Sequence, residues 1–81
     1  MRDKIRTYIE ELEGKETNTR FARLLIICTD VFGEPRIKGS HHRFKTTWQG
    51  LPKVNLQKGS GGKAKPYQVE QVVKALQKAL E

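Results

Sequence analysis

The sequence predicts an α+β fold in which a small antiparallel three-stranded sheet carries helices on one face. Two changes of pattern support this class. Apolar residues recur at intervals of three and four near both ends of the chain, which is typical of amphipathic helices. Between residues 36 and 57 the interval changes to two, which is typical of half-buried strands. The 81 residues predict one domain, spanning residues 1–81.

Three helices are expected from the apolar spacing. The first runs from about Asp3 to Glu13 and forms an additional N-terminal helix within residues 1–14. The second ends at Gly33 and follows three candidate N-caps: Thr17, Asn18 and Thr19. The third covers about Tyr67 to Leu80, and Pro66 suits its first turn because proline is favoured there.

A β-hairpin is expected around Gly39-Ser40, since glycine is favoured at the first central position of a two-residue turn. The turn fixes three cross-strand pairs: Lys38 with His41, Ile37 with His42, and Arg36 with Arg43. Alternation then collects five side chains on a polar face: Arg36, Lys38, His41, Arg43 and Lys45. The apolar face receives Ile37, His42 and Phe44. A third strand, Lys53 to Gln57, continues both faces.

The segment that joins the third strand to the last helix is rich in glycine and lysine and covers residues 59–65. Its first four residues are all small: Gly59, Ser60, Gly61 and Gly62. Such a run is expected to be a flexible connection without fixed structure of its own. Trp48, which lies between the second and third predicted strands, is expected first at the edge of the core, with a base-stacking platform or an anchor for a partner protein as alternatives.

Positive charge is concentrated in one part of the chain. Between Pro35 and Val69 there are eight Lys or Arg residues and no Asp or Glu, whereas the first 34 residues hold six basic and seven acidic residues. The net charge is +7 and the pI is near 9.9. This local field favours nucleic acid as partner, ahead of an acidic protein. The expected RNA-binding residues are Arg36, Lys38, Ser40, Arg43, Lys45 and Lys53.

Several chemistries do not fit these residues. His41 and His42 point to opposite faces of one strand and the single Cys28 lies in an apolar run, so neither a metal site nor a cofactor is expected. The basic segment contains no carboxylate to orient a nucleophilic triad. No apolar stretch approaches the ~20 residues of a membrane span, so the expected location is the cytoplasm.

Acid/base catalysis by histidine among cations does fit the basic segment. It suits cleavage of RNA, because RNA supplies its own nucleophile, the 2′-hydroxyl. His41 would then move the proton, while Arg43, Lys38 and Lys45 hold the phosphate and stabilise the charge on its oxygens. The simpler interpretation makes His41 a surface residue or phosphate contact and His42 a packed residue of the apolar face.

Three segments carry a family resemblance: Gly39-Ser40-His41-His42-Arg43-Phe44-Lys45, then Val54-Asn55-Leu56-Gln57, then Lys63-Ala64-Lys65-Pro66-Tyr67-Gln68-Val69. Together they resemble the HicA family of toxins from bacterial and archaeal toxin-antitoxin pairs, over about residues 20–80. The resemblance implies a fold like the double-stranded-RNA-binding domain and metal-independent ribonuclease activity on messenger RNA. It also implies growth arrest and inhibition by a HicB-type antitoxin.

The resemblance leaves two catalytic candidates, because family members place the active histidine directly after the Gly-Ser turn or one position later. The alternation of faces favours His41, and His42 stays open. Two non-enzymatic functions are also open. One is an RNA-binding module, since residues 59–62 match the Gly-x-x-Gly form of KH domains. The other is a docking module for an acidic protein, through the basic face or Trp48.

Overall fold

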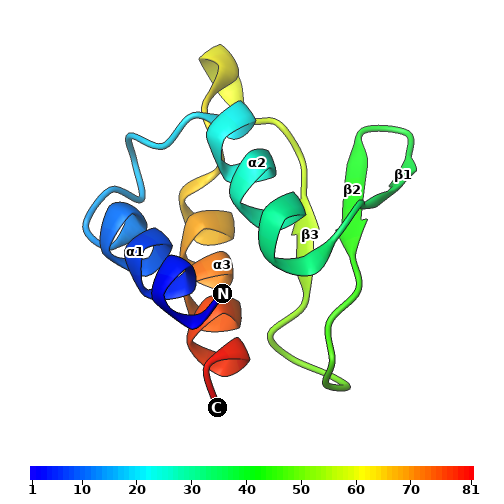
Figure 1. The fold of residues 1–81 in the computed structure, drawn as a ribbon. Helices are drawn as coiled ribbons and strands as arrows, with labels where there is room; N and C mark the ends of the chain where they lie inside the picture. Colours follow the sequence, from blue (N-terminus) through cyan, green and yellow to red (C-terminus); the bar gives the residue numbers. More distant parts are fainter.

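The computed structural model describes all 81 residues, and helices flank a central sheet segment in the chain order (Figure 1). The elements are α1 Arg2–Leu12, α2 Phe21–Phe32, β1 Arg36–Lys38, β2 His41–Phe44, β3 Val54–Leu56, the 3-10 turn η1 Ser60–Gly62, and α3 Pro66–Ala79. The predicted α+β class is confirmed: three helices accompany one three-stranded antiparallel sheet, with helices packed on it. No helix has both the length and the apolar character needed to cross a bilayer.

The sheet has the strand order β1-β2-β3, with β2 in the centre. The predicted hairpin register is confirmed, including the pairs Arg36 with Arg43 and Lys38 with His41. Gly39 has a φ of 60°, a conformation that costs glycine little and other residues considerably more. Strand β3 aligns Asn55 with Arg43, which extends the same alternation across the sheet.

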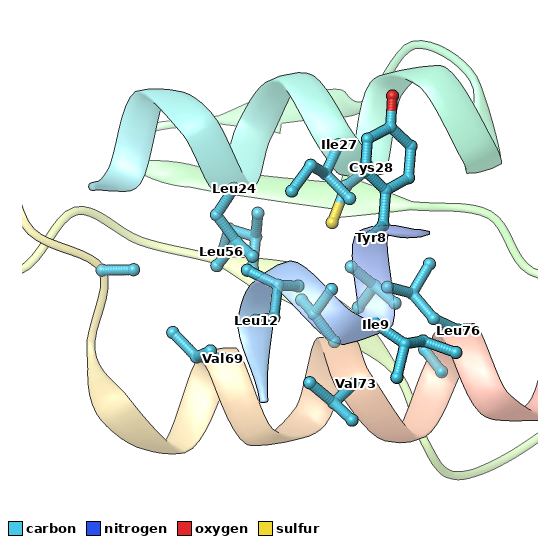
Figure 2. Close-up of a cluster of buried hydrophobic side chains, with 14 of the residues drawn as sticks. Tyr8, Ile9, Leu12, Leu24, Ile27, Cys28, Leu56, Val69, Val73 and Leu76 are labelled. Carbon is cyan, nitrogen blue, oxygen red and sulfur yellow. The ribbon is translucent and has the colours of Figure 1, made fainter. Parts of the chain in front are cut away.

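The core lies between one face of the sheet and the helices. Helix α2 packs over β2 and α3 packs over β3, while α1 packs against α3 on the side away from the sheet (Figure 1). Figure 2 shows side chains from these elements meeting in one cluster, among them Tyr8, Leu12, Leu24, Cys28, Leu56 and Leu76. Cys28 is completely buried, and burial raises the pKa of its thiol to about 12.

Polar contacts fasten α1 to α2. The Tyr8 hydroxyl donates to Asp30 Oδ2 at 2.6 Å, and Lys4 Nζ lies 3.0 Å from the same oxygen. Both interactions lower the pKa of Asp30, with the hydrogen bond from Tyr8 the larger cause. Arg23 binds Glu11 through two hydrogen bonds of 2.7 and 2.8 Å, and this lowers the pKa of Glu11. The acidic groups of this layer are therefore used to hold helices together.

The predicted N-cap of α2 is wrong. Helix α2 begins after Arg20, which gives no side-chain capping bond. Thr19, one of the three candidates, is turned toward other parts of the chain: its hydroxyl donates to the Lys15 carbonyl at 2.7 Å, and its own carbonyl accepts from Ala64 N–H at 2.8 Å. A local hydrogen bond to the Lys15 carbonyl thus occupies the hydroxyl that was expected to cap the helix, while the Thr19 carbonyl makes the tertiary contact to Ala64.

Ile37 was expected on the apolar face, but its side chain is 62% exposed. Strand β1 is an edge strand that lies beyond the helices (Figure 1), and all three of its residues are exposed. Phe44 on the central strand, by contrast, is only 7% exposed. Alternation predicted which way Ile37 points, whereas its burial depends on how far the helical layer extends.

The connection before α3 is ordered, so the prediction of a segment without fixed structure is wrong. Gly59 N–H donates to the Lys63 carbonyl at 2.9 Å, and isolated bridges pair Lys58 with Ala64 and Arg20 with Lys63. Ala64 is buried in the core. Gly61, with a φ of 62° and a ψ of 24°, departs from helical geometry inside this turn and adopts the left-handed conformation that glycine takes most easily. Backbone pairing to distant residues gives this segment its shape.

Candidate nucleic-acid interface

The face of the sheet opposite the helices carries four of the predicted functional residues: Arg36, Lys38, His41 and Arg43. Phe44 and Val54 are buried beneath the helices, while Arg43 and Asn55, their neighbours along the strands, are exposed. The register sets Arg43 directly opposite Arg36 and brings like charges together on this face. We call the face formed by Arg36, Lys38, His41, Arg43, Asn55 and Gln57 the basic face.

His41 is held in place on the basic face. Its Nδ1 lies 3.3 Å from Asn55 Oδ1 on the adjacent strand. An amide oxygen only accepts hydrogen bonds, so with Asn55 in this orientation Nδ1 carries the proton. In the neutral form of the ring the lone pair is then on Nε2, and the half-buried ring keeps one side-chain contact, to Asn55. A neutral imidazole with a free Nε2 is the form that a general base requires.

His42 lies on the helix side of the same strand. Its ring packs edge-to-face against Phe21 of α2, with ring centroids 5.4 Å apart and an interplanar angle of 64°. Its Nδ1 is buried and has no hydrogen-bond partner. The adjacent histidines therefore have different surroundings, and the placement favours His41 for contact with a ligand.

A hollow of about 500 Å³ opens beside Asn55, the partner of His41, although His41 itself is not part of its lining. Arg43, Lys53 and Asn55 line it, so it brings two predicted RNA-binding cations next to the partner of His41. Trp48 closes one side, with its Nε1 donating to the Pro52 carbonyl at 2.9 Å. The Trp48 ring also packs edge-to-face on Phe32, at 6.2 Å between ring centroids. Its half-buried position at the edge of the core agrees with the prediction.

Beyond His41, a chain of hydrogen bonds fixes the hairpin turn. Gln57 Nε2 donates to Ser40 Oγ at 2.9 Å, and Lys65 Nζ donates to Gln57 Oε1 at 3.1 Å. The backbone N–H of Gln57 donates to Oε1 of the buried Gln68 at 3.1 Å. These contacts hold Ser40, a predicted RNA-binding residue, beside His41.

Asn55, Gln57 and Lys65 were not predicted as site residues. The alternation of β3 already placed Asn55 and Gln57 on the polar side, and their positions opposite the hairpin could have suggested contact with His41 and Ser40. Lys65 had no such pattern, because it reaches Gln57 from the segment before α3, eight residues along the chain.

Lys45 does not join the basic face. Strand β2 ends at Phe44, so alternation no longer determines the direction of the next side chain. Lys45 instead lines a separate hollow with Ile5, Phe32 and Ala79, which belong to the helical layer. The expectation that Lys45 holds the phosphate beside His41 is therefore not supported by its position.

No acidic residue neutralises the basic face. The ion pairs of the molecule join Lys4 to Asp30, Arg6 to Asp3, Arg23 to Glu11 and Lys78 to Glu81. All of these residues lie outside the segment from Pro35 to Val69, so its eight Lys and Arg residues have no acidic partner. No group of three His, Cys, Asp or Glu side chains lies close enough to hold a metal ion.

The arrangement can attract a polyanion to a face of cations, and the neutral His41 ring can accept a proton at Nε2 on that face. Comparison with protein-family models, curated proteins and solved structures finds no match to this chain. The resemblance to HicA toxins therefore rests on the three sequence segments that carry it, and the functional argument rests on the residues of the basic face.

Proposed function

We propose that this chain is an endoribonuclease of the HicA toxin type, which cleaves messenger RNA by metal-independent histidine acid/base catalysis in the cytoplasm. The observation that carries the proposal is the His41–Asn55 pair on a face of cations without acidic partners. A surface that only bound phosphate would need the cations, but it would not need an oriented imidazole among them.

In the proposed reaction, His41 Nε2 removes the proton from a ribose 2′-hydroxyl. The 2′-oxygen attacks the adjacent phosphorus and the bond from phosphorus to the 5′-oxygen breaks. The departing 5′-oxygen takes a proton from water, and the imidazolium gives its own proton back to the solvent. The products are a 2′,3′-cyclic phosphate and a free 5′-hydroxyl. Arg43 lies across from Asn55 and stabilises the charge that builds on the phosphate oxygens. DNA lacks the 2′-hydroxyl and is not cut.

The test is incubation of a defined single-stranded RNA with the purified protein in excess EDTA, comparing wild type, His41→Ala and His42→Ala. We expect wild type to cut the RNA and His41→Ala to lose about 10²- to 10⁴-fold in rate, the usual contribution of an acid/base residue. His41→Ala should change the free energy of unfolding by only about 0.5 kcal/mol or less.

His42→Ala is the matched control, since it removes the neighbouring imidazole from the packed side of the strand. It should retain cleavage at temperatures where the variant is folded. Cleavage that survives in His41→Ala, or that disappears in His42→Ala alone, would contradict the assignment. Cleavage that EDTA abolishes would contradict the metal-independent mechanism.

A HicB-type antitoxin is the proposed protein partner, and we expect it to cover the basic face and exclude RNA from His41. The unpaired cations there would attract an acidic surface. Protection of β2 and β3 amides from hydrogen exchange in the complex, together with loss of RNA binding, is the expected result. An antitoxin seated on α1, with RNA access unchanged, is incompatible with this arrangement.

The alternative is a non-catalytic RNA-binding module that uses the same face. The hollow beside Asn55, with Arg43 and Lys53 on its walls, favours phosphate binding whether or not cleavage follows. Binding without cleavage in wild type and both histidine variants would support this alternative. Competition between RNA and an acidic protein for the face would then separate a nucleic-acid module from a protein-docking module.

A further inference from the structure

A second hollow, of about 620 Å³, lies between the end of β3 and the start of α3. Of its eight lining residues, three are lysines and none is acidic. The lysines are Lys58, Lys63 and Lys65. None of them takes part in an ion pair, and only Lys65 donates a side-chain hydrogen bond, to Gln57. We call this site the lysine hollow.

The lysine hollow is a built feature. The bridge between Lys58 and Ala64 closes the loop, and Gly59 N–H donates to the Lys63 carbonyl at 2.9 Å. A Cβ on Gly59 would meet that carbonyl oxygen at 2.8 Å, so the close approach requires glycine. The backbone thus holds several like charges around one space, an arrangement that is unfavourable until an anion enters it.

The lysine hollow connects to the basic face. Lys65 donates to Gln57 at 3.1 Å, and Gln57 donates to Ser40 at 2.9 Å, next to His41. The hollow beside Asn55 includes Gly50 and Lys53 from the connection that precedes β3, whereas the lysine hollow includes Lys58 and Gly59, which follow β3, so the two lie toward opposite ends of that strand. Figure 1 shows the two connections leaving β3 at its opposite ends. His41 pairs with β3 between them.

An exposed aromatic residue follows the lysine hollow along the chain. Tyr67 comes directly after Pro66, a lining residue, and is 59% exposed, although it is not itself part of the lining. Its hydroxyl accepts a hydrogen bond from the buried Gln68 at 3.4 Å. An exposed aromatic residue one position from a group of lysines suits a strand of nucleic acid, which presents bases and phosphates together.

We propose that the lysine hollow binds backbone phosphates of the same RNA strand that passes His41, so that the substrate runs from the hollow beside Asn55 to the lysine hollow. This inference rests on the proposed function and deepens it. It assigns the enzyme a substrate class: RNA with an unpaired stretch long enough to reach both ends of β3. Shorter RNA occupies only the basic face.

The test compares Lys58→Ala/Lys63→Ala with Lys15→Ala/Lys74→Ala, a control pair of exposed lysines outside both hollows. Both pairs are made in the His41→Ala background, so that RNA is bound without being cut. Binding of a dinucleotide, a trinucleotide and longer single-stranded RNAs of up to roughly 16 nucleotides, the upper end of common single-strand sites, is measured by fluorescence anisotropy at several salt concentrations.

For long RNA we expect Lys58→Ala/Lys63→Ala to weaken binding by roughly tenfold at 0.1 M salt and to reduce the slope of log K against log salt by about 1.4, or about 0.7 for each lost phosphate contact. The shortest RNA should bind equally to variant and control. Lys58→Arg/Lys63→Arg keeps both charges and should retain the affinity for long RNA.

The inference would be overturned if the two alanine pairs changed the RNA affinity equally at every RNA length. It would also be overturned if Lys58→Ala/Lys63→Ala lost the same affinity for short RNA as for long RNA. Failure of long RNA to bind wild type would overturn it as well. The proposed function is judged separately, by cleavage of the shortest RNA by wild-type protein in EDTA. If wild type cleaves short RNA but the affinity loss of Lys58→Ala/Lys63→Ala does not depend on RNA length, only the role of the lysine hollow is contradicted. If the affinity loss depends on length but no RNA is cleaved, only the ribonuclease activity is contradicted.

Discussion

Charged side chains are paired in one region of the molecule and unpaired in another. The first region is the helical layer of α1 and α2, and the second is the sheet with the loop that follows it. In the helical layer, Asp30 is bonded to Tyr8 and Lys4, and Glu11 is bonded to Arg23. From Pro35 to Val69, by contrast, the Lys and Arg residues have no acidic partner. The difference indicates that charge in the first region serves the fold, while charge in the second is available to a ligand.

The largest effect on stability is expected where the sheet meets the helical layer. Phe44→Ala should lower the free energy of unfolding by about 3 to 5 kcal/mol, because the ring is buried and its removal leaves a cavity. Ile37→Ala, an apolar truncation on the exposed edge strand, should cost less than about 1 kcal/mol. Denaturant unfolding measures both values, and similar costs for the two variants would show that the helices cover β1 after all.

A smaller effect is expected when the helical layer is acidified. The pKa values of Asp30 and Glu11 are lowered in the folded chain, so their stabilising contribution is present above their unfolded pKa values near 4 and is lost as the pH falls through the lower folded values. Wild type should therefore lose melting temperature between pH 6 and pH 3. The double variant Asp30→Asn/Glu11→Gln should lose less over the same interval.

The double variant also provides the control, because every other carboxyl group is kept. If wild type and variant lose the same number of degrees between the two pH values, the contacts of Tyr8, Lys4 and Arg23 do not contribute to stability in the way described. Scanning calorimetry at each pH, at fixed ionic strength, makes the comparison.

The smallest effect has the opposite sign. Arg36 and Arg43 face each other across the hairpin, and like charges directly opposite are unfavourable. Arg36→Gln should therefore stabilise the fold by about 0.2 to 1 kcal/mol while weakening RNA binding. A loss of stability, or an unchanged RNA affinity, would contradict the interpretation that Arg36 binds RNA at a cost to the stability of the fold. Thermal unfolding and RNA titration of the same sample decide this.

Most of the fold could be predicted because its determinants are local. Apolar spacing placed both ends of the first and third helices within one residue of their observed ends and the end of the second at Gly33, next to its observed end, and Gly39 fixed the hairpin register. The same alternation separated His41 from His42, whose rings do lie in different surroundings. The part of the site that follows from periodicity was therefore accessible from the chain alone.

What could not be predicted depends on contacts between distant segments. The ordered shape of residues 59–65 comes from pairing with Arg20 and Thr19, far earlier in the chain. Lys65 reaches the basic face only because α3 packs beside β3. The direction of Lys45 escaped prediction because alternation ends with its strand at Phe44. In each case the position of the residue depends on a contact with a segment that is distant in the sequence, and a local sequence pattern does not show that contact.

The buried thiol of Cys28 can serve as a chemical reporter of unfolding. With a pKa of about 12 in the core, essentially none of the thiol is ionised at neutral pH, and alkylating reagents have no route to it. In the open chain the same group returns to an ordinary reactivity. Because this is the one cysteine in the chain, the rate of mass increase under a thiol reagent reports how often the core opens, in the free protein or in any complex.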